Sequence, residues 1–178
     1  MKSIFLFISI LIFATNGFSQ TIESKQEIQA QFSSKNIAAY QSNSHSMILE
    51  FYDYASRYSQ TKDDKLKKQI QSNLESLVQN NSIKIPNFEN QSTSYQNLDE
   101  FLASIEYKNW KFEVNEIKSS SNIQLDHWIN SYSLKIDKGK KIVKETIQQT
   151  IYFTPIQKKF GTKTKTVWAL KLGTIDIH

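Results

Sequence analysis

The sequence contains no cysteine. This absence excludes disulfide bonds, thiolate metal ligands, a cysteine nucleophile and the lipidated cysteine of a bacterial lipoprotein. Arginine is almost as scarce, because Arg57 is the only arginine among the 22 basic residues of a chain with net charge +5. Arginine is the side chain best suited to bidentate contacts with phosphate, so we predict that the chain has no nucleic-acid partner.

Histidine is also rare, and the three histidines are His45, His127 and His178. None of them belongs to a His-x-x-x-His or Glu-x-x-His pair, so we predict no metal site and no cofactor. His127 follows Asp126 in the stretch DHWINSYSLKID. Successive residues of a strand point to opposite faces, and we therefore predict that Asp126 and His127 cannot form a hydrogen-bonded dyad.

Long apolar runs are missing everywhere except at the N-terminus. There, Lys2 precedes the apolar run Ile4–Phe13, and small residues follow before Gln20. This layout is typical of a secretory signal peptide, which we assign to residues 1–19. A helix of about ten residues rises only about 15 Å, roughly half of a hydrocarbon core, so the run is too short to span a membrane. We predict a protein that is exported to the periplasm or the extracellular space and has no transmembrane span after cleavage.

Removal of the signal peptide leaves about 159 residues, which is the size of a single domain that can bury a core without disulfides. We divide this part into a polar N-terminal segment, residues 20–36, and a single α+β domain, residues 37–178. No internal repeat and no long linker interrupts it.

Apolar side chains at helical spacing predict three helices in the first half of the chain. The first covers residues 48–58, and an earlier start, as far back as Ser34, is the alternative. The second starts after Thr61 in a capping-type arrangement, and the third follows Asn97. A short strand that contains Pro86 precedes the third helix, and the proline places this strand at a sheet edge.

From Trp110 onward the apolar period changes from about 3.6 to about 2, which indicates strands. Four such strands follow one another with short connections, as in an antiparallel meander that is half-buried on one face. The predicted fold class is therefore α+β, with the N-terminal helices packed on a mainly antiparallel sheet.

The hairpin between the second and third of these strands is predicted to turn at Lys138–Gly139. The two apolar faces must lie on the same side of the sheet, and the simplest register that achieves this sets Tyr132 opposite Glu145. The same reasoning places Trp168 of the last strand beside Gln149.

This register gathers polar side chains among aromatic ones on the apolar face. A buried carboxylate needs a partner or a raised pKa, and a few polar groups in an aromatic-lined concavity are typical of a small-molecule pocket. The alternative is that a bulge turns Glu145 outward, or that a bond between Tyr132 and Glu145 is purely structural. The candidate pocket residues are Trp128, Asn130, Tyr132, Glu145, Gln149 and Trp168.

The order of elements and the final stretch FGTKTKTVWALKLGTI resemble the nuclear transport factor 2-like superfamily, in particular its exported bacterial members. The resemblance covers about residues 34–177 and rests on element order and strand pattern. It implies a curved, cone-like sheet with a pocket between its concave face and the helices. No catalytic residue carries over, because enzymes of this superfamily place their acid–base groups at positions that cannot be matched one by one. A cystatin-like sheet over one helix is the alternative fold, which three preceding helices fit less well.

These features predict an exported, non-catalytic module that binds a small apolar ligand or an envelope protein. The alternative is a small enzyme, an isomerase, dehydratase or hydrolase, that uses Glu145 as general acid or base. The resemblance also implies that a homodimer can form through the outer face of the sheet. Lysines cluster in the two hairpins at 138–141 and 158–165, which a meander places at opposite ends of the sheet. We interpret them as solvated hairpin ends, with an anionic envelope surface as the alternative partner.

Overall fold

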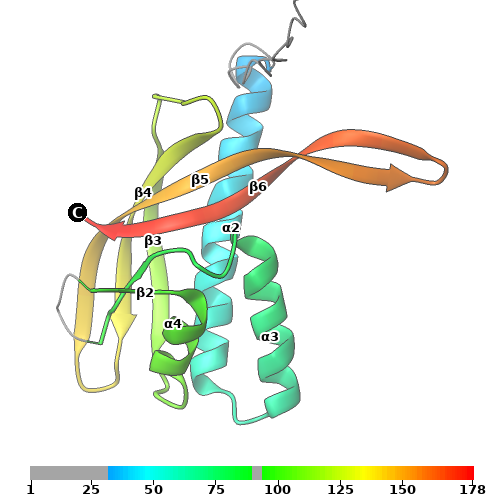
Figure 1. The fold of residues 1–178 in the computed structure, drawn as a ribbon. Helices are drawn as coiled ribbons and strands as arrows, with labels where there is room; N and C mark the ends of the chain where they lie inside the picture. The colour runs from blue at the N-terminus through cyan, green and yellow to red at the C-terminus, as the bar shows by residue number, and fades with distance from the viewer. Residues whose placement is uncertain (1–31, 90–93) are drawn as a thin grey trace, which may run out of the picture.

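The computed structural model describes residues 32–89 and 94–178, so the predicted signal peptide and residues 20–31 lie outside the described part. The fold class is confirmed as α+β, with helices packed against a four-stranded antiparallel sheet (Figure 1). A long helix, α2 (Ser34–Gln60), crosses the sheet, and α3 (Asp64–Leu77) packs beside it. The last three residues of the predicted polar segment, 34–36, therefore belong to α2, which already begins at Ser34.

The starts of the helices are set by polar side chains that accept the free N–H groups of the first turn. Helix α4 (Leu98–Ile105) follows Asn97 as predicted. The Asn97 side chain caps it, and Glu100 completes a capping box with Asn97. The predicted cap of α3 was wrong, because Asp63 rather than Thr61 accepts the N–H groups of the first turn. Both side chains lie in the same short turn, and the carboxylate of Asp63 is the one placed at the cap position.

The sheet is the predicted antiparallel meander, in the order β3 (Lys111–Ser119), β4 (His127–Asp137), β5 (Ile142–Phe160) and β6 (Lys163–Ile177). Two further strands, β1 (Ile85–Pro86) and β2 (Tyr95–Gln96), form a separate small ladder. The segment before β1 also covers the free edge of β6, where the Gln79 N–H donates to Leu172 O and the Ile175 N–H donates to Lys84 O.

The predicted register of β4 and β5 was wrong by two residues. Tyr132 lies opposite Ile147, and Leu134 lies opposite Glu145. The predicted pairs require a two-residue turn, whereas the chain forms a wider loop in which Lys138 N–H donates to Lys141 O. Because the error is an even number, every side chain still points to the predicted face. The faces were therefore predicted correctly and the partners were not.

The position of Trp168 was also predicted wrongly, since it lies opposite Pro155 and not beside Gln149. Strands β5 and β6 continue much further from the body than the apolar pattern suggested, and their ladder runs to the pair Phe160–Lys163. An irregularity between Gln149 and Ile151 adds a further shift along the ladder.

The interior between α2, α4 and the sheet is filled with large side chains. Five aromatic residues in it are at most 1% exposed, namely Trp128, Tyr52, Phe51, Phe101 and Phe153. Aromatic pairs with ring centroids about 6 Å apart connect α2 to α4 and to the sheet. Burial of this apolar surface supplies most of the free energy that holds helices and sheet together.

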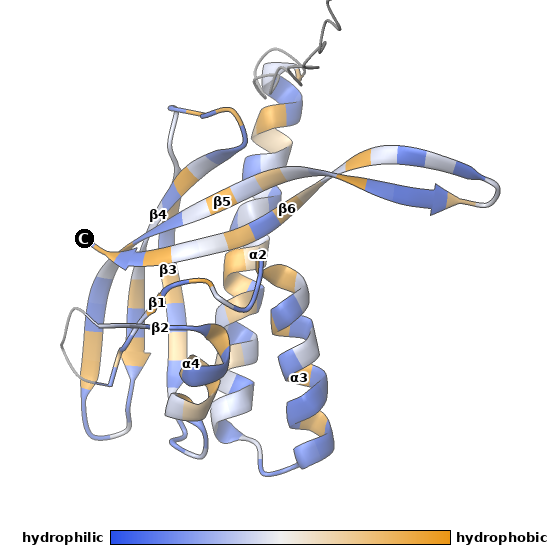
Figure 2. Cartoon of the chain, in the orientation of Figure 1, coloured by the Kyte–Doolittle hydropathy of each residue, from blue (hydrophilic) through white to orange (hydrophobic). Residues whose placement is uncertain are grey.

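Residues 154–167 form a two-stranded extension that leaves the body, and we call it the arm (Figure 1). Residues 154–166 are all exposed. Hydrophobic positions occur in both strands of the arm near the body, and most of the outer part of the arm is hydrophilic (Figure 2). Phe160, the last residue of β5, is the hydrophobic exception at the tip. Pro155 stands at its base, two residues after Phe153, whose N–H is the last that β5 donates toward the β4 side. A proline fits there, because an N–H at this position would face solvent.

Candidate functional site

Four of the six predicted pocket residues lie together on the inner face of the sheet, beneath α2. They are Trp128, Asn130, Tyr132 and Gln149, and each is at most 2% exposed. Strand alternation explains why they share this face, because the three residues of β4 are two positions apart and Gln149 lies opposite Asn130.

A first chain of hydrogen bonds ties α2 to β4 through polar side chains. Trp128 Nε1 donates to Asn130 Oδ1 at 3.1 Å, and Asn130 Nδ2 donates to Ser44 Oγ at 2.8 Å. Ser44 Oγ then donates to the carbonyl of Gln41 at 2.6 Å. Both polar atoms of the Asn130 amide therefore have a partner. We interpret this series of hydrogen bonds as a structural cross-link between α2 and β4.

A second chain runs from α2 through Tyr132 to β5. The hydroxyls of Tyr52 and Tyr132 are 3.1 Å apart, and Tyr132 donates to Gln149 Oε1 at 2.9 Å. Burial raises the pKa of both phenols well above 10, so both hydroxyls stay protonated and can donate. Within residues 32–89 and 94–178, Gln149 Nε2 is the one buried side-chain donor that lacks a partner.

The remaining two candidates lie apart from these chains. Glu145 is opposite Leu134, partly exposed, and the Tyr132 hydroxyl is bonded to Gln149 instead. Trp168 stacks on Phe153 at the base of the arm, with ring centroids 4.7 Å apart. The structure thus brings four of the six residues together, and ligand binding by them stays a prediction.

The prediction that Asp126 and His127 are separated was wrong. His127 Nδ1 lies 2.7 Å from Asp126 Oδ1. Strand alternation does not apply to this pair, because β4 begins at His127 and Asp126 belongs to the preceding bend. The His127 ring also lies 5.7 Å from that of Tyr152, on the outer face of the sheet. The pair faces away from the four buried candidates.

An open groove of about 560 Å³ runs between α2 and α3. Its single cation, Arg57, is paired with Asp53 one helical turn away at 2.8 Å, and both side chains are more than half exposed. An exposed ion pair of this kind contributes little to binding or stability. The lining residues are Tyr54, Arg57, Gln60, Thr61, Leu66, Gln69, Ile70 and Asn73.

The apolar pattern of the sequence did not predict that the arm extends away from the body as a separate structure. The arm carries four lysines, and the sequence has no acidic residue between Glu145 and Asp176. The hydrogen-bonded ladder sets Lys158 directly opposite Lys165. Like charges at directly opposed positions destabilise a strand pair, and a two-stranded hairpin alone is only marginally stable in water. The signal was present in the sequence as a 30-residue stretch without acidic residues.

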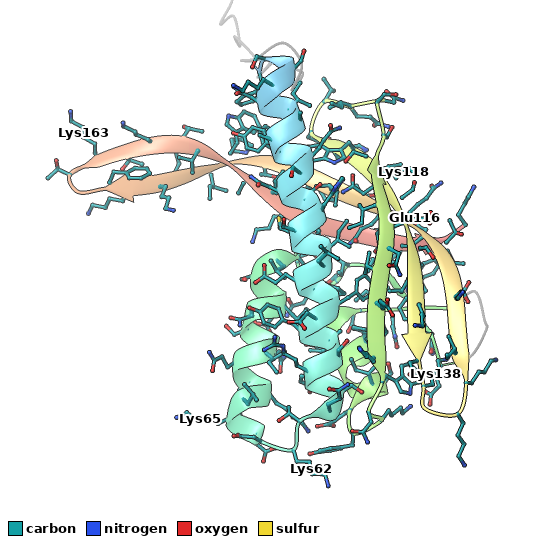
Figure 3. All side chains as sticks on the ribbon, turned by 180° about the vertical axis from the view of Figure 1, so that it is seen from behind. Lys62, Lys65, Glu116, Lys118, Lys138 and Lys163 are labelled. Carbon is teal, nitrogen blue, oxygen red and sulfur yellow. The ribbon has the colours of Figure 1, made fainter. Side chains whose placement is uncertain are left out.

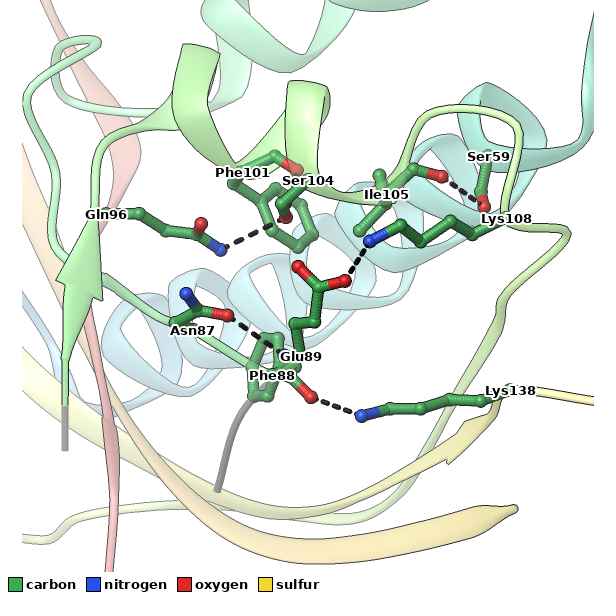
Figure 4. Close-up of polar contacts among 10 residues, drawn as sticks. All are labelled: Ser59, Asn87, Phe88, Glu89, Gln96, Phe101, Ser104, Ile105, Lys108 and Lys138. Atoms are coloured by element: carbon green, nitrogen blue, oxygen red, sulfur yellow. Dashed lines mark hydrogen bonds and ion pairs between the residues drawn. The ribbon is translucent and has the colours of Figure 1, made fainter. Parts of the chain in front are cut away.

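In the other hairpin, Lys138 contacts the body, while Lys140 and Lys141 are exposed. Lys138 Nζ donates to the carbonyl of Phe88 (Figure 4). The same Nζ lies 4.5 Å from the centre of the Trp110 ring. Burial, with a smaller effect of the nearby Lys141, lowers the pKa of Lys138.

In the described residues none of the arm lysines forms an ion pair. Lys163 lies at the far end of the arm, remote from Lys62, Lys65 and Lys138 (Figure 3). The two lysine clusters are therefore separated. Within the arm, Lys158 Nζ lies 6.0 Å from the centre of the Phe160 ring.

No group of three or more histidine or acidic side chains is placed to hold a metal ion in the part of the chain that the structure describes. In the same residues, no helix combines the length and hydrophobicity that a bilayer crossing requires. Comparison with known protein families, with curated protein sequences and with solved structures finds no match for this chain.

Proposed function

We propose that this chain is an exported, non-catalytic binding module of the nuclear transport factor 2-like kind, and that it binds an anionic partner through the arm. Its element order, with helices before a long antiparallel meander, supports the superfamily proposal. Export rests on the N-terminal sequence pattern alone.

The arm carries this proposal. A protein gains little stability from a ribbon that leaves its core, because residues 154–166 are exposed and bury no large apolar surface. Opposed lysines make the ribbon less stable still. Both features become favourable when an anionic partner covers the arm, since the partner neutralises the lysines and removes apolar surface from water.

The interior supports a non-catalytic module better than the enzyme alternative. A general acid or base must come within hydrogen-bond reach of a substrate in a water-excluding site. Glu145 is partly exposed and lies outside the two buried hydrogen-bond chains. Trp128 and Tyr132 are buried, and the Tyr132 hydroxyl contacts that of Tyr52 on α2. The polar groups beneath α2 therefore serve to join helix and sheet.

The test is binding of the chain from residue 20 onward to fluorescein-labelled dextran sulfate, measured by anisotropy at low and high salt. The arm variant replaces Lys158, Lys159, Lys163 and Lys165 with glutamine. The control variant changes the net charge equally by replacing Lys62, Lys65, Lys118 and Lys140, which are exposed on the body.

We expect the arm variant to lose affinity by about tenfold or more, and the control variant by about twofold, because only clustered charges act together on one polymer. Binding of the wild-type chain should weaken steeply with salt. An equal loss in both variants would mean that net charge alone drives binding, and the proposal would then be abandoned.

A further inference from the structure

The arm has two unlike faces, and this difference points to the class of partner. Cross-strand pairing puts Ile156 beside Val167, Lys158 beside Lys165 and Phe160 beside Lys163. These six residues alternate in the same sense along both strands, so they share one face, which we call the mixed face. The opposite face carries Gln157, Lys159, Thr164 and Thr166, and Gln157 Nε2 donates to Thr166 Oγ1 at 2.9 Å.

We propose that the mixed face docks on a lipid bilayer surface that contains anionic headgroups. This inference rests on the proposed function of the arm and names its partner. Three lysines and three apolar side chains interleave on the mixed face, which is the composition of elements that lie in a membrane interface. Lysine stems extend along apolar surface while their ammonium groups reach the headgroups.

The exposed apolar groups favour a bilayer over a soluble polyanion. Ile156 is 42% exposed and Phe160 is 49% exposed, although neither packs on the body. Phe160 stands at the tip, next to Gly161, whose φ of +61° permits the tight turn. A projecting tip can enter the interfacial region without moving the folded body, whereas a polyanion offers these side chains no apolar environment.

Other macromolecules fit the mixed face less well. The arm has no arginine for bidentate phosphate contacts and only Phe160 as a base-stacking ring, so a nucleic acid is disfavoured. A second copy of the arm would bring four more lysines against the first set, and lysines along free strand edges oppose pairing between ribbons. Charge complementarity therefore selects an anionic surface.

The experiment is sedimentation of the chain from residue 20 onward with phosphatidylcholine vesicles and with vesicles that also contain about one third phosphatidylglycerol. Each lysine near an anionic surface adds roughly 1 kcal/mol, which is about fivefold in partitioning. We expect at least a tenfold preference for the anionic vesicles, and loss of this preference at high salt.

The apolar contribution is tested separately with Ile156→Ser combined with Phe160→Ser. The matched control is Leu49→Ser combined with Leu66→Ser, which removes two apolar side chains of similar exposure from the body. The arm variant should bind anionic vesicles about tenfold more weakly while keeping its affinity for dextran sulfate. The control should match the wild type in both assays.

The outcomes separate the two proposals. Binding to dextran sulfate without binding to anionic vesicles would overturn the lipid proposal and leave the proposed function standing. Binding to neither would overturn both. A higher affinity for duplex DNA than for vesicles, or an arm-dependent dimer in native mass spectrometry, would assign the mixed face to that partner and refute the lipid surface. Vesicle binding that is unchanged by Ile156→Ser combined with Phe160→Ser would also refute the lipid proposal.

Discussion

The buried hydrogen bonds around Tyr132 allow a quantitative test of the interior. Substitution Tyr132→Phe removes one hydroxyl and leaves the ring in place, so packing against Tyr52 is conserved. The Gln149 amide, whose Nε2 already lacks a partner, then loses the donor to its Oε1 as well. The variant thus holds a wholly unpaired amide in a site that is 0% exposed.

The magnitude follows from the asymmetry between making and losing a hydrogen bond. A net contribution of about 1 kcal/mol is lost with the bond, and leaving a buried acceptor unpaired costs about 1–3 kcal/mol. We expect the free energy of unfolding of Tyr132→Phe to fall by about 2–4 kcal/mol. In a domain of this size the midpoint of thermal unfolding should fall by roughly 4–16 °C.

The companion substitution Gln149→Leu should act differently. It removes the unpaired Nε2 together with the acceptor, while the hydroxyls of Tyr132 and Tyr52 keep each other as partners. We expect a change within about 1 kcal/mol, and a double variant that is more stable than Tyr132→Phe alone. Urea unfolding followed by tryptophan fluorescence gives all three values and the coupling energy of the cycle.

The reasoning would be refuted by strictly additive effects of the two substitutions. A large destabilisation by Gln149→Leu would also refute it, because that result would show that Nε2 makes a favourable contact. A conserved m-value in all variants is the control for an unchanged denatured state.

Two further predictions concern the sheet and the long helix. A Cβ on Gly173 would lie 2.5 Å from Tyr152 Cε2, so Gly173→Ala should lower the free energy of unfolding by about 1–3 kcal/mol, and Tyr152→Ala in the same chain should recover part of it in urea unfolding. Burial lowers the pKa of His45 below 6.5, and its Nε2 lies 2.8 Å from Ser119 Oγ. The imidazole of His45 therefore binds a proton less readily in the folded chain than in the unfolded chain. The contribution of His45 to the free energy of unfolding is complete above pH 6.5 and is lost as the pH falls below that value. The urea midpoint should fall between pH 7.5 and 5.5, and less so in His45→Asn; an unchanged dependence in that variant would contradict the assignment.

Much of the architecture could be predicted because it depends on local periodicity. The helical spacing of Ile48, Phe51, Tyr52 and Ala55 predicted the buried face of α2, and all four are at most 1% exposed. Alternation in β4 likewise predicted that Trp128 and other pocket candidates face inward. Both patterns repeat within a few residues, so the chain carries them without reference to distant segments.

The pairing of these faces could not be predicted in the same way. A loop longer by two residues leaves each strand's faces unchanged and replaces every cross-strand neighbour, which is what separated Tyr132 from Glu145. The contact between Asp126 and His127 escaped prediction because it depends on where β4 begins. The boundary of an element is a weaker signal in sequence than its period.

The sequence by itself determined the absence of disulfides, the α+β order, the inner and outer faces and a long stretch without acidic residues. Only the tertiary structure decided that Asn130 and Gln149 end in buried hydrogen-bond chains, and that residues 154–167 leave the body as an arm. The physical reason is that periodicity and charge are properties of neighbouring residues. Which groups meet across the core, and how far two strands extend past it, depend on loop lengths and packing between segments far apart in the chain.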